Sequence, residues 1–152
     1  MRRLAVFLAT SAGAGFAPIA PGTAGSLVGL VIYLYTMFWT LRDQAILVVA
    51  IIAIGIWAST RAAEYFSRED PGQVVIDEVA GQLVTLFATG VGLRGALVGF
   101  VFFRVLDIIK PWPAGRFERL HGGTGIMADD VMAGIYGNLL LQAAVRIIPG
   151  II

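Results

Sequence analysis

Ionisable residues stand out in a chain that is otherwise strongly apolar. Residues 104–130 contain Arg104, Asp107 and Lys110 at three-residue spacing, followed by the adjacent carboxylates Asp129 and Asp130. Three-residue spacing places side chains along one face of a helix, and the proline after Lys110 is expected to end that helix. Ionisable groups at the edge of a hydrophobic body are costly, so they indicate a functional site. The simpler alternative for the first three residues is an intrahelical ion pair.

A second pair of carboxylates lies upstream, in the sequence DPGQVVIDEVAG of residues 70–81. Asp70-Pro71-Gly72 is typical of a turn, and Asp77 and Glu78 are expected to open the next helix. The helix dipole alone explains two acidic residues at a helix N-terminus. That explanation is weaker at a membrane edge, where two unneutralised carboxylates are costly.

A third polar stretch, PIAPGTAGS, covers residues 18–26. Thr23 and Ser26 offer hydroxyl groups beside the backbone N–H groups of a helix N-terminus, which is an anion-binding arrangement. The alternative is that either hydroxyl only caps the helix.

Together these residue types predict metal-assisted chemistry on a phosphate group. Carboxylate ligands without cysteine select a hard cation, Mg²⁺ or Mn²⁺, and a lone histidine argues against zinc. Cationic side chains beside such a metal neutralise charge on a phosphoryl group. The expected metal ligands are Asp77, Glu78, Asp107, Asp129 and Asp130, of which Asp77, Glu78, Asp107 and Asp130 are the expected catalytic residues. The expected phosphate-binding or substrate-binding residues are Thr23, Ser26, Arg104, Lys110, Arg116 and His121, although a histidine in a loop has many ordinary roles.

The composition predicts that an integral membrane body positions these groups. The chain has 152 residues, with 58% hydrophobic and 14% charged side chains and a mean hydropathy of +0.84; soluble proteins have about 25% charged residues. The length predicts one domain, residues 1–152. A soluble bundle with an unusually apolar core is the alternative. A net charge of +1 without a basic run argues against nucleic-acid binding.

The apolar segments predict an all-α bundle of about four to five short transmembrane helices. These segments cover residues 25–41, 44–60, 79–93, 95–103 and 131–145, with Asp129 or Asp130 capping the last helix. It stays open whether the apolar residues 4–16 form a membrane helix or a re-entrant loop. Small residues suit close packing of helices in lipid, and they occur at Gly25, Gly29, Gly55, Gly81, Gly99, Gly134 and Gly137.

Five spans would place residues 1–24, 61–78 and 104–130 on one side of the membrane. That side carries eight of the eleven basic residues and all acidic residues except Asp43. The excess of basic residues makes it the cytoplasmic side. All the polar motifs are therefore expected on the cytoplasmic face.

At these residues the sequence resembles the phosphatidylglycerophosphatase A family. The matching pieces are A-PGT-GS (20–26), DP–VVIDE–G (70–81), FR–DI-KP-P (103–113) and GG-GIM-DD--AG (122–134), in the family's order. The resemblance implies a Mg²⁺-dependent, multi-pass phosphatase of the bacterial inner membrane. Such an enzyme converts phosphatidylglycerol phosphate to phosphatidylglycerol and inorganic phosphate, a step in phospholipid and cardiolipin synthesis.

For this chemistry, the nucleophile is either water or one of the carboxylates. Arg116, Arg119 and His121 are expected to meet the second phosphate or anionic lipid headgroups. Two other functions stay open: another phosphotransfer enzyme acting on anionic lipid headgroups, and a membrane transporter that binds cations. The sequence also leaves open the number of metal ions and whether the protein forms a homo-oligomer.

Overall fold

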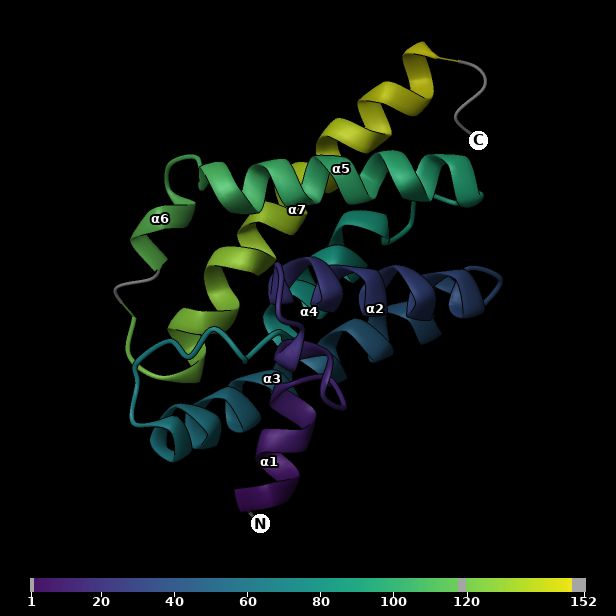
Figure 1. Cartoon of the computed structure of the whole chain (residues 1–152). Coiled ribbons are helices and arrows are strands. Elements are labelled where there is room, and N and C mark those ends of the chain that lie inside the picture. The colour runs from purple at the N-terminus through teal and green to yellow at the C-terminus, as the bar shows by residue number, and fades with distance from the viewer. Residues whose placement is uncertain (1, 118–119, 149–152) are drawn as a thin grey trace.

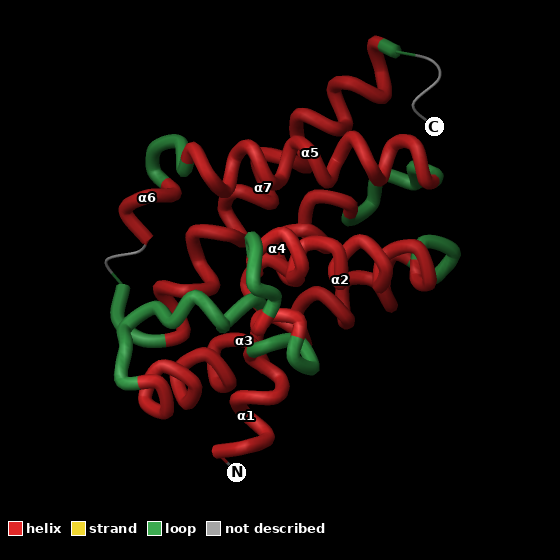
Figure 2. The backbone as a smooth tube through the Cα atoms, in the orientation of Figure 1, coloured by secondary structure: helices red, strands yellow, loops and turns green. Residues whose placement is uncertain are grey.

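The computed structural model describes residues 2–117 and 120–148, and this part of the chain is helical without strands (Figures 1 and 2). This confirms the all-α prediction. The elements in order are α1 (Arg2–Ala9), a 3-10 helix η1 (Ala14–Phe16), α2 (Pro21–Thr36), α3 (Leu41–Phe66), α4 (Ile76–Leu86), α5 (Leu93–Ile109), α6 (Ala114–Phe117) and α7 (Gly123–Ile147).

Each of the five expected apolar segments corresponds to one of these helices, but their boundaries differ. As expected, α5 ends at Ile109, directly before Lys110 and Pro111. The prediction that Asp129 or Asp130 caps the last helix is wrong, because α7 begins at Gly123 and both carboxylates lie inside it. The earlier start depends on α3, where the Thr60 hydroxyl accepts a hydrogen bond of 3.0 Å from the Gly123 N–H.

The short helix α4 lies at the centre of the bundle (Figure 1). Nine of its eleven residues are buried, and it contacts α2, α3, α5 and α7. At 1.5 Å per residue it is about 16 Å long, roughly half the thickness of a bilayer's hydrocarbon core. The expected span 79–93 is therefore not one helix. It stops at Leu86 because the Asn138 side chain of α7 donates to the carbonyls of Val84, at 3.2 Å, and Phe87, at 2.8 Å.

Glycines allow the surrounding helices to approach α4 closely. A methyl group at Gly25 of α2 would lie 2.7 Å from the carbonyl oxygen of Val75, and one at Gly134 of α7 would lie 2.5 Å from that of Gly81. Contacts below 3.0 Å also occur at the other five glycines that the sequence singled out, which confirms the prediction of close helix packing. These approaches bring the helices that carry the polar motifs to nearly backbone contact.

The polar stretches of the sequence meet at one end of the bundle. The N–H of Val75 donates to the carbonyl of Ala9 at 2.9 Å, and Arg104 of α5 reaches the Ser26 hydroxyl of α2 at 3.4 Å. The N-termini of α2 and α4 therefore lie beside the C-terminal end of α5. Parts of the three polar stretches thus meet, whereas the placement of residues 1–24, 61–78 and 104–130 on one side of a membrane stays a prediction.

The outside of the bundle is rich in large apolar side chains. Exposed examples occur on α2, α3, α5 and α7, among them Val31, Val49, Val101 and Leu139. Among the described helices, α3 alone is both long and apolar enough to cross a membrane, with 22% of its most apolar window buried. The described helices thus include one candidate span, where the sequence predicted four to five.

The contact between α4 and α7 generates a prediction about packing. Gly134→Ala is expected to reduce the free energy of unfolding by about 1–3 kcal/mol, because the new methyl group meets the backbone of Gly81, which cannot move aside cheaply. Gly92→Ala is the control, since a Cβ there has no neighbour within 4 Å. Helical circular dichroism during heating in detergent measures both. Equal stability of the two variants would contradict the packing argument.

Candidate active site

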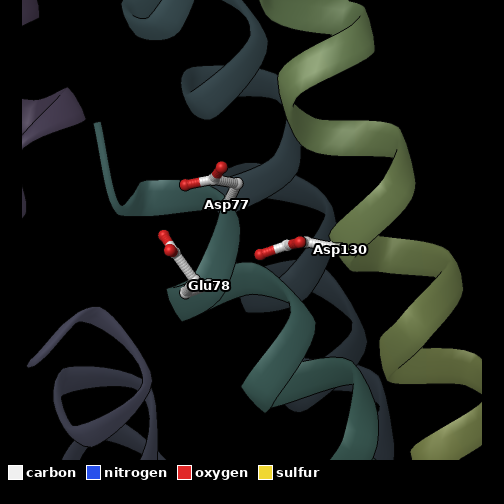
Figure 3. Close-up of side chains that lie close together, drawn as sticks. All are labelled: Asp77, Glu78 and Asp130. Atoms are coloured by element: carbon white, nitrogen blue, oxygen red, sulfur yellow. The ribbon is translucent and has the colours of Figure 1, made fainter. Parts of the chain in front are cut away.

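Three carboxylates from two helices converge at the polar end of the bundle. Asp77 and Glu78 lie in the first turn of α4, and Asp130 comes from α7 (Figure 3). One oxygen from each lies within 4.8 Å of the other two, and this group is referred to below as the carboxylate cluster. In Figure 3 the three side chains point into the same space between the helices.

The carboxylate cluster is incompletely hydrogen-bonded, with Asp77 and Asp130 buried and Glu78 half-buried. Asp77 is 9% and Asp130 is 3% exposed. Buried oxygens of all three residues, Asp77 Oδ1, Glu78 Oε2 and Asp130 Oδ2, have no hydrogen-bond partner. A buried polar atom without a partner is costly, so the geometry favours a ligand that these oxygens bind.

The charge of the cluster also favours a cation. Burial raises the pKa of Asp77 and of Asp130 well above the usual 3.8, and nearby carboxylates, Glu78 and Asp107 respectively, raise them further. Burial raises the pKa of Glu78 as well. All three residues lie outside α3 and outside the expected spans. These carboxylates ionise more readily when a cation lies beside them. A site with oxygen ligands alone fits Mg²⁺ or Mn²⁺.

Arg104 and Asp107 of α5 form the next layer around the cluster. The Arg104 Nη1 donates to Asp107 Oδ2 at 2.5 Å and to the Ser26 Oγ at 3.4 Å. Asp107 also lies close enough to Asp130 for its charge to raise the pKa of that carboxyl. The expected helical face of α5 therefore places one guanidinium and one carboxylate directly beside the cluster.

The first turn of α2 closes the site from the other side. A Cβ at Gly22 would collide with Glu78 Oε1, so the glycine lets the Glu78 side chain lie as close to α2 as it does here. A carboxylate at a helix N-terminus is favourable because the N–H groups there carry partial positive charge. Neither Thr23 nor Ser26 caps α2, whose N-cap is Ala20; the Ser26 hydroxyl donates to the Gly22 carbonyl at 2.9 Å. Thr23 is half-buried in the same turn.

Lys110 and Asp129 pair with each other beside the cluster. The Lys110 Nζ lies 2.6 Å from Asp129 Oδ2 and links the end of α5 to α7. Of the five carboxylates expected to bind metal, three thus converge, Asp107 adjoins them, and Asp129 is held by a lysine. The roles of these residues stay predictions.

The remaining expected site residues lie further out. Arg116 is exposed, and its guanidinium stacks on the Trp112 ring at 5.7 Å from the ring centre. His121 is exposed and lines a cavity together with Glu69 and Asp129. Arg119 lies outside the described residues. The sequence did not predict the contacts of Gly22 and Glu69. Gly22 lies in the PGT motif, which could have indicated its role, whereas no sequence motif points to Glu69.

Comparison with known proteins assigns a class to this arrangement. A relative from Bacteroides thetaiotaomicron, named "Putative phosphatidylinositol-3-phosphatase", is 38% identical and covers 93% of both chains. Proteins named phosphatidylglycerophosphatase A from Escherichia coli and Haemophilus influenzae are 38% and 32% identical, covering 84% and 90% of this chain and 76% and 85% of their own. No solved structure matches significantly.

The protein is therefore a phosphatase. The profile of the family described as Phosphatidylglycerophosphatase A matches residues 7–145, nearly the whole chain. The chain belongs to the phosphatidylglycerophosphatase A family, as its four motifs predicted.

The raised pKa values predict how a metal changes stability. Because folded Asp77 and Asp130 bind protons more tightly than the unfolded chain, the metal-free protein is expected to lose stability as the pH rises above about 4. Asp130→Asn removes one of the repelling charges, so in EDTA at pH 7 it should raise the unfolding midpoint by about 2–4 °C. The same variant should lose most of the stabilisation that Mg²⁺ gives the wild type.

Thermal unfolding with EDTA and with excess Mg²⁺ measures both effects. Glu64→Gln is the control, because Glu64 pairs with Arg61 on the exposed side of α3 at 3.1 Å; it should resemble the wild type in both solutions. A lower midpoint for Asp130→Asn in EDTA would contradict the account.

Proposed function

We propose that this protein hydrolyses the terminal phosphate monoester of phosphatidylglycerol phosphate, releasing phosphatidylglycerol and inorganic phosphate. The observation that carries the proposal is the buried carboxylate cluster with its unpartnered oxygens, beside a guanidinium. Membership of the family and the names of two relatives supply the substrate. Phosphatidylglycerol is a membrane lipid and a precursor of cardiolipin, so the enzyme would act in phospholipid synthesis.

Asp77, Glu78 and Asp130 would hold Mg²⁺, with Mn²⁺ as the alternative cation. When bound, the cation would supply Lewis acidity toward phosphoryl oxygens. Asp107 lies beside Asp130 and would hold Arg104 in place through their ion pair. Asp129 would act from outside the cluster, through its pair with Lys110.

Arg104 is the strongest candidate for binding the phosphate. Its planar guanidinium presents several donors at fixed angles, which matches the oxygens of a phosphate group. The side chain is 18% exposed and is fixed by Asp107 and Ser26, so little freedom is lost on binding. Thr23, in the first turn of α2, and Lys110, which follows α5, would contact the other phosphate oxygens.

The lipid substrate requires that this site lie at a membrane surface. We propose a multi-pass protein of the bacterial inner membrane with the carboxylate cluster facing the cytoplasm. Support comes from the apolar exterior of the bundle, from α3 as a candidate span, and from the basic residues concentrated near the polar end. Arg116 on Trp112 would suit the interface, where aromatic rings and cations meet lipid headgroups.

Phosphatidylinositol 3-phosphate is a second candidate substrate. It is favoured by the Bacteroides thetaiotaomicron relative, whose name refers to that lipid and which matches nearly the whole chain. Both lipids present a phosphate monoester on a hydroxylated headgroup, so the same cluster chemistry would serve either one. Phosphate release from each lipid by the purified protein decides between them.

Single substitutions of the carboxylates test the proposed function. Asp77→Asn and Asp130→Asn should each lower kcat for phosphate release by at least about 100-fold, because each removes an anionic oxygen from the cation site. Asp107→Asn should reduce it less, since it acts through Asp130 and Arg104. The assay uses phosphatidylglycerol phosphate in detergent micelles, with Mg²⁺ and with EDTA.

Glu64→Gln serves again as the surface control and should keep full activity. Near-native turnover by the Asp77 and Asp130 variants, or wild-type activity that survives EDTA, would overturn the assignment of the site.

A further inference from the structure

A buried amide lies one helical turn along α4 from the carboxylate cluster, and none of the proposed steps uses it. The Gln82 side chain is 0% exposed, and neither its Nε2 nor its Oε1 has a hydrogen-bond partner. A buried amide without partners keeps the full cost of its desolvation, whereas an apolar side chain of similar size would avoid that cost. The amide is therefore expected to serve a partner.

Gln82 and Glu78 face the same neighbouring helix, α2. A Cβ at Gly25 would lie 3.3 Å from the Cβ of Glu78, and a Cβ at Gly29 would lie 2.8 Å from the Cβ of Gln82. Both pairs of residues are four apart, so the two side chains lie in one line along the contact between α2 and α4. The residue of α2 that Gln82 meets here is a glycine, which offers no side-chain partner.

The geometry of a helix directs the Gln82 amide toward Glu78. Side chains in an α-helix lean toward its N-terminus and lie over the preceding turn. For Gln82 the preceding turn carries Glu78, which lies in the first turn of α4. Residues at this spacing have Cβ atoms about 5–6 Å apart, so changes of rotamer alone can bring the amide and the carboxylate together.

The other neighbours of Gln82 on α4 are poorer partners for its amide. Val79 and Leu86, at three- and four-residue spacing, are apolar. The Thr85 hydroxyl is directed toward α7 and bonds carbonyl oxygens of α4 and α7 at 3.0 and 3.3 Å. Glu78, by contrast, has a buried Oε2 without a partner. An amide N–H and a carboxylate oxygen are complementary as donor and acceptor.

We propose that Gln82 is a positioning residue for the cation site, and that its Nε2 donates a hydrogen bond to Glu78 Oε2. The inference rests on the proposed function and adds to it the group that orients one of the proposed ligands. Carboxylates that bind a metal are commonly oriented by a further hydrogen bond, and loss of that bond weakens metal affinity by about 10–100-fold. Gln82 thus fixes the Glu78 carboxylate from the apolar side of the carboxylate cluster.

The test measures how strongly Mg²⁺ stabilises the purified protein in detergent, without substrate. Thermal unfolding is followed by circular dichroism from EDTA to excess Mg²⁺, which gives an apparent Kd for the cation. Gln82→Met roughly keeps the side-chain volume and removes the donor, so this Kd should rise about tenfold. In EDTA the variant should unfold at the wild-type temperature or above it, because an unpaired buried amide has been removed.

A double-mutant cycle tests the pair itself. Glu78→Asp keeps the negative charge and withdraws the carboxylate from Gln82 by one methylene group. If Gln82 acts through Glu78, adding Gln82→Met to this variant should change the apparent Kd by less than about twofold. A tenfold effect of Gln82→Met in both backgrounds would show that Gln82 acts independently of Glu78, and would overturn the inference.

Gln142→Met is the matched control. Gln142 lies about 18 Å further along α7 than Asp130, and its amide donates to Asn138 at 2.7 Å. The same substitution at this position should leave the apparent Kd for Mg²⁺ unchanged, even where loss of the bond to Asn138 lowers the unfolding temperature.

An unchanged apparent Kd for Gln82→Met would overturn the inference, and a lower unfolding temperature in EDTA would then identify a purely structural amide. Gln82→Leu, a second apolar variant, is measured in parallel and should behave like Gln82→Met. A wild type that Mg²⁺ does not stabilise would overturn both the cation site and this inference. A wild type that Mg²⁺ stabilises but that releases no phosphate from phosphatidylglycerol phosphate would instead refute the proposed function alone.

Discussion

The burial of several like charges at the N-terminal end of α4 is the constraint on which the rest of the structure depends. Asp77, Glu78 and Asp130 would repel one another in any medium, and burial makes their ionisation harder still. The surrounding groups offset part of this cost: Asp77 and Glu78 lie in the first turn of α4, where the helix dipole favours negative charge, and Arg104 pairs with Asp107. A divalent cation would offset most of the remainder. The apolar helices around these carboxylates therefore hold them together, but they supply too few hydrogen-bond donors and positive charges to compensate them.

Small residues are what make this concentration of charge possible. Gly22 admits the Glu78 carboxylate to the backbone of α2, and the Gly81–Gly134 contact brings α7 close enough for Asp130 to reach α4. With larger side chains at these positions the helices would separate and the carboxylates would move apart. The distances between the carboxylates thus depend on the close packing of the helices. The sequence motifs that carry acidic residues also carry glycines, which follows from this requirement.

The sequence predicted the helices, their glycine contacts and the gathering of the polar stretches. Each of these follows from a pattern that can be counted along the chain, namely apolar runs, small residues and the distribution of charge. It did not predict where α7 begins, since the Gly123 N–H is satisfied by Thr60 of another helix. The early end of α4 depends in the same way on Asn138. Nor could spacing alone separate Asp129 from Asp130: adjacent residues on a helix point in different directions, and only the position of Lys110 decides which partner Asp129 finds.

The attachment of α4 at both of its ends has a consequence for motion. At one end Asp130 of α7 lies against the first turn of α4, and at the other Asn138 of α7 binds its last carbonyls. Two such attachments, about two helical turns apart, oblige α4 and α7 to move as one rigid body. The remaining sides of the site are supplied by α2 and α5, which Arg104 joins through Ser26. Lys110 of α5 is paired with Asp129 of α7, and Gly25 of α2 packs against the backbone of Val75, so the α4–α7 pair is the fixed wall to which both of these helices are attached.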